Sequence, residues 1–470
     1  MNLARVRPRH EAVPITPVRS RVAERMGWTL LLAPVFLSGV VIPLLPPLAW
    51  KVNATVAGAL VQAGGFYVLA RLGVLRGSPL DRPALAFLGA TILATIFSVD
   101  RLVSFYPSSL RGEGLLVSAA YITAGLAAAR LPRRPGAVLL NAVLAGSSVV
   151  GLVALAQFYD RDLLQLAGFH LARPEVDLAG GTRGFIFDPT AVGTRSIATL
   201  GQPLVVGGLA ALVLPVGVTL TVLAPSTAAA ILRGAATAMV YGALVASQTR
   251  AAWVATAIAG GLLLWLLPRS PLVRRRMILL AATLTVMTLL MVASRPQAAL
   301  PRRVSSIAEE VQHSDRSLGQ RVYIWKHTVR LIAQRPVLGW GSSALLGRFP
   351  DYGSAEYRQM FGEEAVELID NPHNEFVDLL FSTGLVGLTA YLWIWAVSAT
   401  RLLRAWRARS TVSARSAALL ASLGAYFIWM QSAWSHIGVA NVFWVFLGLA
   451  ATYHEDRPTT YSTDPQHRPG

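Results

Sequence analysis

The chain is a series of long apolar runs separated by mostly short polar connections. Twelve of these runs are about 20 residues long, which is enough for a helix to cross the hydrocarbon core of a bilayer. They are 27–47, 55–73, 83–99, 114–130, 136–158, 202–223, 230–247, 250–267, 277–294, 375–397, 416–433 and 437–453. The pattern predicts an all-α polytopic membrane protein with about 12 transmembrane helices.

Composition agrees with a membrane protein. The 470 residues are 54% hydrophobic and 14% charged, with a mean hydropathy of +0.51, whereas soluble domains carry about 25% charged residues. Cysteine is absent, so disulfides and thiolate metal sites are excluded. The runs 230–247 and 250–267 nearly touch, and their polar joint, Gln248-Thr249-Arg250, favours a tight hairpin over one long segment.

The distribution of charge sets the orientation. With the N-terminus inside, the inner segments hold 24 Arg/Lys and 6 Asp/Glu, and the rest of the chain holds 18 of each. This is the bias that the positive-inside rule describes. The arginines are spread over seven short segments, so a nucleic-acid partner is disfavoured. We expect a multi-pass protein of the inner (cytoplasmic) membrane, with a signal anchor as its first span and both termini cytoplasmic.

Two connections are long, and both fall on the outer face. The later one is large enough for a helical subdomain between the ninth and tenth spans, and its stretch 319–341 predicts an amphipathic helix that packs on the membrane surface or on other helices. The apolar stripe of that helix is Val322, Trp325, Val329 and Ile332, with Arg321, Lys326, Thr328 and Arg330 off the stripe. The chain thus divides into a cytoplasmic basic tail (1–26), spans one to nine (27–294) with an outer loop (159–201), a periplasmic loop subdomain (295–374), spans ten to twelve (375–453) and a cytoplasmic tail (454–470).

Polar residues gather at the outer ends of several spans. They are Arg111, Arg195 with Gln202, Arg250, Arg321, and His373 with Asn374, followed by Glu375 and Asp378. If these ends converge, they line an outward-facing cavity with guanidinium groups and one imidazole. Guanidinium forks match phosphate oxygens, so the ligand they indicate is a polyanion at the level of the headgroups.

Each of these residues also has a purely structural interpretation. Arg111 and Arg250 could reach lipid phosphates, Arg195 could have a structural role, and Arg321 could lie on a solvated helix face. His373 could cap a helix or pack. We expect structural roles for His170, His313 and His327, and we keep His436 as an alternative site histidine.

The motifs carry a resemblance to a known family. The pattern S-x-x-R-A from Ser247, R-x-x-x-W from Arg321, "RPVLGWG" (335–341) and "HNEFVDLLFSTGLVGL" (373–388) resembles the O-antigen ligase and polymerase superfamily of membrane glycosyltransferases. "FSVDRLVSFYPSSLRGEGLL" and "TLGQP" look like an early outer loop and a segment before the sixth span in that superfamily. The similarity covers roughly residues 80–400. Leu204 departs from it, because many members have asparagine there.

The resemblance implies a C-type glycosyltransferase architecture and transfer of a glycan from undecaprenyl pyrophosphate to an acceptor hydroxyl outside the membrane. The site residues suit this chemistry, because arginines stabilise the charge that develops on pyrophosphate. Histidine, whose unperturbed pKa is about 6.5, suits a general base. We therefore expect His373 to be the base and Arg250, Arg321, Arg111 and Arg195 to hold the pyrophosphate, with Asn374, Gln202 and either Glu375 or Asp378 in support.

No cofactor is expected, because the donor already carries the energy for transfer. No P-loop is present, and the first outer loop, "AWKVNAT", lacks the acids that hold a metal in some enzymes of this architecture. The acceptor stays open among a lipid-core sugar, a growing polysaccharide and a protein serine or threonine. The alternatives outside this class are a transporter or flippase of polyanionic lipids, which would not need His373, and a purely structural subunit. The two halves of the chain show no repeat of the kind common in secondary transporters.

Overall fold

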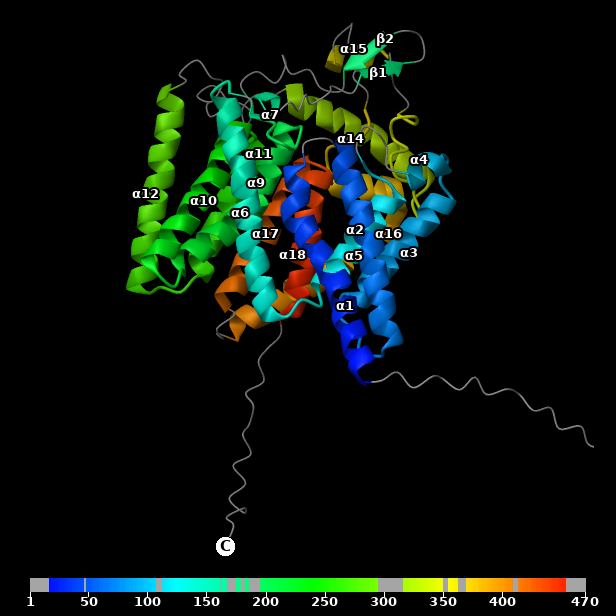
Figure 1. Cartoon of the computed structure of the whole chain (residues 1–470). Coiled ribbons are helices and arrows are strands. Elements are labelled where there is room, and N and C mark those ends of the chain that lie inside the picture. The colour runs from blue at the N-terminus through cyan, green and yellow to red at the C-terminus, as the bar shows by residue number, and fades with distance from the viewer. Residues whose placement is uncertain are drawn as a thin grey trace, which may run out of the picture.

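A computed structural model describes most of the chain. The described residues are 17–45, 48–106, 112–161, 163–166, 175–178, 182–185, 195–294, 316–349, 354–361, 369–408 and 413–453. Arg111, His170 and His313 lie outside these ranges. The described chain forms a bundle of long helices with smaller elements gathered at one end (Figure 1).

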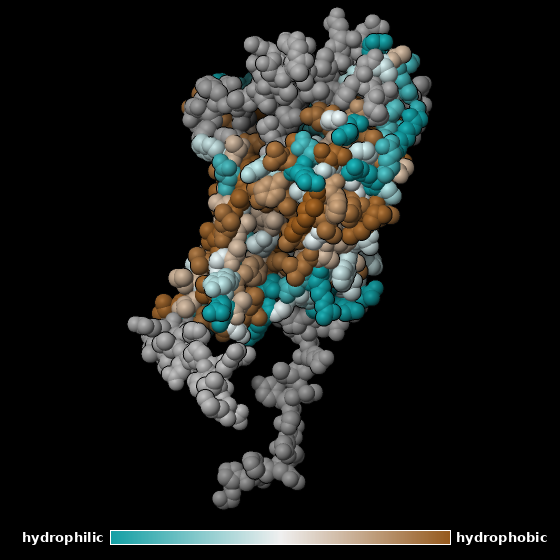
Figure 2. All heavy atoms as spheres, turned by 90° about the vertical axis from the view of Figure 1, so that its right-hand side faces the viewer, coloured by the Kyte–Doolittle hydropathy of each residue, from teal (hydrophilic) through white to brown (hydrophobic). Residues whose placement is uncertain are grey.

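Each of the twelve predicted runs overlaps a helix. These helices are α1 (Pro17–Phe36, continued by the π turn Leu37–Val41 and the 3-10 turn Ile42–Leu44), α2 (Leu48–Arg71), α3 (Asp81–Ile96), α5 (Leu115–Ala128), α6 (Arg133–Phe158), α9 (Pro203–Val222), α10 (Thr227–Ser247), α11 (Arg250–Leu266), α12 (Pro271–Ser294), α16 (Glu375–Arg407), α17 (Ser413–Trp429) and α18 (Ile437–Thr452). Seven of the described helices are long and apolar enough to cross a membrane, and α5, α11 and α18 are shorter apolar helices. Figure 2 shows an apolar belt between two polar ends. The protein is therefore a multi-pass membrane protein.

The hairpin between α10 and α11 is tight, as the polar joint predicts. Helix α10 ends at Ser247, and Gln248 follows in the left-handed conformation with φ of 49°. Thr249 then occupies the N-cap position of α11, whose first residue is Arg250. The turn therefore places Arg250 at an end of the bundle.

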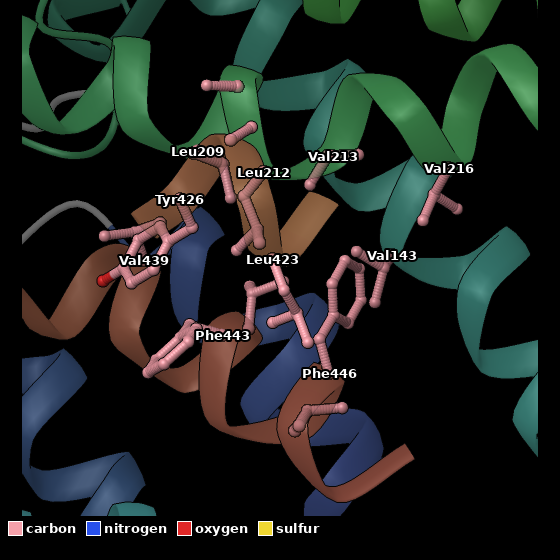
Figure 3. Packing of buried hydrophobic residues seen from close by; sticks show 14 of the residues in the cluster. Val143, Leu209, Leu212, Val213, Val216, Leu423, Tyr426, Val439, Phe443 and Phe446 are labelled. Carbon is pink, nitrogen blue, oxygen red and sulfur yellow. The ribbon is translucent and has the colours of Figure 1, made fainter. Parts of the chain in front are cut away.

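The centre of the bundle is α9, which is buried on nearly all sides by α6, α10, α17 and α18. Figure 3 shows leucine and valine side chains of α9 against Tyr426 of α17 and Phe443 of α18. Small residues allow the helices to approach closely. A Cβ atom added at Gly208 would lie 2.5 Å from the Trp429 ring, and one at Gly151 would lie 2.3 Å from the Met239 carbonyl oxygen.

The smaller elements lie at the end of the bundle opposite the start of α1 (Figure 1). They are α4 (Arg101–Phe105), α7 (Leu163–Leu166), the antiparallel strands β1 (Glu175–Leu178) and β2 (Thr182–Phe185), α14 (Arg316–Gln334) and α15 (Ala355–Phe361). A 3-10 turn, Met430–Ser432, follows α17. The α14 segment and its neighbours have a small apolar core of their own, formed by Tyr323, Ile324, Leu331, Trp340, Phe349 and other residues.

The buried face of α14 differs from the predicted apolar stripe. Val322 and Val329 are more than half exposed, whereas Thr328, predicted to lie off the stripe, is buried. Ile332 is buried as predicted. The buried face is centred on Ile324 and Thr328 because α16 and the segment after α14 pack there. The helix itself is confirmed, and its orientation is corrected.

Helix α16 is broken at Gly384, where φ is 63° and ψ is −167°. The break frees backbone groups, and the segment 336–341 pairs with them. Trp340 and Gly341 N–H groups donate to the carbonyls of Phe381 and Ser382 at 2.8 and 2.9 Å, and Leu385 N–H donates to the Pro336 carbonyl at 2.8 Å. A Cβ atom at Gly384 would lie 2.2 Å from the Val337 oxygen, so only glycine fits. This pairing joins the "RPVLGWG" segment to the helix that follows His373.

Candidate functional site

The turn that carries His373 is built by its two neighbouring asparagines. His373 has a left-handed backbone with φ of 51°, and its N–H donates to Asn371 Oδ1 at 2.9 Å. Asn374 is the N-cap of α16, and its Oδ1 accepts from the N–H groups of Phe376 and Val377 at 3.0 and 3.2 Å. Asn374 is therefore the cap of α16, while Asn371 holds the turn. Capping fixes where the helix begins and hence where His373 sits.

Two tryptophans hold the same turn from other elements. Trp325 of α14 donates from Nε1 to the Pro372 carbonyl at 2.7 Å. The ring of Trp434, between α17 and α18, meets the His373 ring edge to face with centroids 4.9 Å apart. Arg321 is half-buried and lies one helical turn before Trp325, so the two side chains share a face of α14. The structure thus brings the helix of Arg321 to the His373 turn.

Glu375 and Asp378 are both buried at the start of α16. The Glu375 carboxylate accepts from both the backbone N–H and the hydroxyl of Ser435, the latter at 2.7 Å. Glu375 therefore anchors the link 433–436 that carries Trp434. Asp378 faces a cavity described below.

Arg195 and Arg250 also come together. Arg195 donates from Nε to the Ser247 carbonyl at 3.1 Å and from Nη2 to Thr249 Oγ1 at 3.4 Å. Thr249 immediately precedes Arg250, which is half-buried. Gln202, at the N-cap position of α9, is half-buried and makes no capping bond with its side chain. The predicted pair Arg195 and Arg250 thus lies at one turn.

Sequence reasoning missed Lys51. This side chain is 1% exposed near the start of α2, and its Nζ donates to the carbonyls of Leu45 and Thr199, the latter at 2.8 Å. Thr199 in turn donates from its hydroxyl to the Pro43 carbonyl at 2.7 Å. Lys51 therefore fastens the segment that begins with Arg195 to the start of α2. The sequence offered one indication of its importance. Lysine is rare in this chain, since Lys51 and Lys326 are the only two lysines in the sequence.

The segment 195–202 reaches the link beside His373. A Cβ atom added at Gly438 would lie 2.8 Å from Leu200 Cδ2, and Gly438 is the second residue of α18, which directly follows the link 433–436. Another predicted cation, Arg111, precedes Gly112, and a Cβ atom at Gly112 would lie 3.2 Å from Leu48 and Val52 side chains of α2. Segments far apart in sequence therefore meet at one end of the bundle.

The other described histidines near this end have structural contacts. His327 is buried, and its ring centroid lies 4.5 Å from that of Tyr323 and 5.6 Å from that of Phe349. His436 is the N-cap of α18, with Nδ1 accepting from Gly438 N–H at 3.1 Å. His327 thus has the packing role expected of it, and His436 caps a helix.

A polar cavity of about 60 Å³ lies among α3, α5 and α16. Three carboxylates line it, those of Glu113, Glu375 and Asp378, together with Tyr121 and several hydroxyl side chains. Among the residues that the structure describes, no group of three or more His, Cys, Asp or Glu side chains is placed to hold a metal ion.

One comparison with known proteins identifies part of the chain. Residues 234–392 match the family model described as O-antigen ligase (Wzy_C). These residues belong to the O-antigen ligase family. A comparison with curated proteins gives no match. Membership implies a glycosyltransferase-type enzyme with lipid-linked glycan substrates, in general terms.

The O-antigen ligase domain contains only part of the site. It includes Arg250, Arg321 and His373, and it confirms the resemblance drawn from the motifs over this region. Arg195 and Lys51 lie outside the matched residues, yet their hydrogen bonds join them to this end of the bundle. The domain is therefore completed by segments that precede it in the chain.

Proposed function

We propose that this protein transfers a glycan from undecaprenyl pyrophosphate to an acceptor hydroxyl on the outer face of the cytoplasmic membrane. The observation that carries the proposal is that the segments with the described arginines and with His373 lie at the same end of the bundle (Figure 1). Trp325 ties the helix of Arg321 to Pro372, and Arg195 bonds the turn that begins with Ser247 and ends at Arg250.

In this proposal the arginines bind the donor. Arg250, Arg321, Arg195 and Arg111 hold the pyrophosphate, and they stabilise the negative charge that grows when the bond between sugar and phosphate breaks. Arg195 has a second task. Its bonds to Ser247 and Thr249 fix the turn from which Arg250 extends.

His373 serves as the general base. The acceptor oxygen attacks the anomeric carbon, its proton passes to the imidazole, and undecaprenyl pyrophosphate leaves with the bonding electrons. The position of His373 supports this role, because hydrogen bonds from its neighbours fix its turn at the start of α16. Asn374 and Asn371 hold the turn, and Glu375 supports it through Ser435.

The wider architecture belongs to the same proposal. We infer about 12 transmembrane helices in a C-type glycosyltransferase arrangement, with both termini cytoplasmic and the loop subdomain 295–374 outside. We expect transfer to need no metal ion or cofactor. Within this class the acceptor is a lipid-core sugar, a growing polysaccharide or a protein hydroxyl.

The deciding experiment uses the purified protein in lipid nanodiscs with lipid-linked oligosaccharide and candidate acceptors. Released undecaprenyl pyrophosphate and a glycosylated acceptor are the expected products, and they should persist in the presence of a chelator. Movement of the lipid-linked glycan across a vesicle membrane, without any release of pyrophosphate, would favour the flippase instead.

A further inference from the structure

The polar cavity lined by Glu375 has features that the donor does not explain. It lies among α3, α5 and α16, and neither Arg195 nor Arg250 is among the residues that line it. Its carboxylates, Glu113, Glu375 and Asp378, carry the same sign of charge as a pyrophosphate. A dianionic donor group is therefore disfavoured in this cavity.

One side chain in the cavity indicates a ligand. Tyr121 is 5% exposed and lines the cavity, and its hydroxyl has no hydrogen-bond partner in the described part of the chain. The phenol interacts electrostatically with Glu113 and Glu375. A buried hydroxyl without a partner costs free energy, so such groups in native proteins normally meet a ligand or water. The hydroxyls of Ser118, Ser342 and Ser382 add further hydrogen-bonding groups.

The base of the cavity is aromatic. Phe87, Tyr391 and Trp444 line it, with ring centroids of Phe87 at 5.4 Å from Tyr391 and 6.0 Å from Trp444. The face of an aromatic ring is electron-rich and attracts the slightly positive C–H groups of a sugar. Carboxylates accept hydrogen bonds from hydroxyl and amino groups, and the phenol can donate one. Together these groups suit a polyhydroxyl edge.

The cavity holds only a small group. Its volume of about 60 Å³ gives room for a few water-sized groups. An entire sugar ring does not fit, whereas one edge with two hydroxyl or amino groups does. Glu375 connects this cavity to the turn that carries His373, because it lines the cavity and lies two residues after His373.

We propose that this cavity is the acceptor subsite, and that it takes a sugar edge bearing hydroxyl or amino groups and no acidic substituent. The inference rests on the proposed glycosyl transfer and adds to it the chemical class of the acceptor. Phosphorylated or carboxylated sugar edges are excluded by the three carboxylates, which the cavity keeps partly shielded from solvent.

The test measures sugar binding separately from transfer. The full-length protein in nanodiscs is titrated with three probes: methyl glucoside, methyl 2-amino-2-deoxyglucoside and methyl glucoside 6-phosphate. An Arg250→Ala/Arg321→Ala background weakens binding of the phosphate to the arginines, and any phosphate binding that Glu113→Gln leaves unchanged is assigned to the remaining arginines. We expect the amino glycoside to bind at least as tightly as the neutral one, and the phosphate to bind at least about tenfold more weakly than either.

Two conservative variants locate the site. Glu113→Gln should weaken the amino glycoside about tenfold, since it removes a charged acceptor, and Tyr121→Phe should weaken both uncharged and amino glycosides about fivefold. The matched control is Tyr241→Phe, because the Tyr241 hydroxyl bonds Thr288 at 2.8 Å and the side chain does not line the cavity. It should leave all three affinities unchanged.

Three outcomes would overturn the subsite: equal binding of the phosphate, no effect of either variant, or no binding of any glycoside. The outcome of the transfer assay does not depend on the outcome of the sugar-binding measurement. Sugar binding that follows these expectations without any transfer would reject the proposed function, whereas transfer with an unchanged acceptor KM in both variants would reject the subsite alone.

Discussion

The end of the bundle that carries His373 has two regions of opposite character. The cationic region, defined by Lys51, Arg195 and Arg250, is held by backbone carbonyls of Leu45, Thr199 and Ser247. The acidic region, defined by Glu113, Glu375 and Asp378, surrounds a cavity with an aromatic base. The link 433–436 lies between them, bonded to Glu375 and followed by Gly438, which contacts Leu200.

The difference shows how one bundle end can sort two substrates by charge. Hydrogen bonds to carbonyl groups orient Lys51 and Arg195, and the guanidinium groups of the cationic region suit a polyanion. The acidic region repels the same polyanion, and its carboxylates can accept hydrogen bonds from hydroxyl groups. A donor and an acceptor that enter from the two regions would meet at His373, the residue proposed to take a proton.

The largest effect is expected where the two regions meet. His373→Asn should lower the transfer rate by about 100–10,000-fold, the usual contribution of a general base, while expression and donor binding stay normal. Asparagine tolerates the left-handed backbone of this position, so the variant isolates chemistry from strain. His373→Ala should do no better.

The control for this prediction is His436→Asn, because asparagine also caps helices well and His436 caps α18. Near-normal turnover is expected there. Retention of more than about a tenth of wild-type activity by both His373 variants would exclude a general base at this position, and the search would pass to Glu375, Asp378 and His436.

The next largest effect concerns the cationic region. Arg250→Ala and Arg321→Ala should each slow transfer by about 100–1,000-fold, since each removes a donor to developing charge. Lysine should rescue only in part, because it lacks the planar fork. Arg330→Ala is the matched control, since Arg330 is exposed on the same helix as Arg321. Full activity of both lysine variants would indicate that positive charge alone is sufficient and that the geometry of the guanidinium group does not matter.

Lys51→Met tests how the cationic region is assembled. The variant leaves the carbonyls of Leu45 and Thr199 without their hydrogen-bond donor, which should cost about 1–3 kcal/mol of stability. A lower Tm and a higher donor KM are expected, with the acceptor KM less affected. An equal rise in both KM values would argue against separate donor and acceptor regions.

The smallest effect is expected at Trp325. Trp325→Phe keeps the ring but loses the hydrogen bond to Pro372, and one such bond is worth about 1 kcal/mol, or roughly fivefold in rate. The expected change is in kcat, because the bond positions the His373 turn. Trp393→Phe, a half-exposed tryptophan farther along α16, is the control. A loss as large as that of the His373 variants would mean that Trp325 does more than position the turn.

The sequence by itself determined the positions of the helices, the break before Arg250 and the start of α16 near His373. These features depend on contacts within one helical turn and on the length of apolar runs, both of which are local properties. The motifs around Ser247, Arg321 and His373 also indicated the O-antigen ligase family before any geometry was known, and the match over 234–392 confirms it.

Only the tertiary structure decided how the site is held and where its second region lies. Lys51 and Thr199 are 148 residues apart, and Glu375 and Ser435 are 60 apart, so no periodicity in the sequence joins them. The buried face of α14 was predicted wrongly for the same reason. Which face of this helix is buried depends on where α16 and the segment after α14 pack against it. Hydropathy reports which residues leave water, whereas the partners of a buried charge are fixed by segments that meet only in the folded chain.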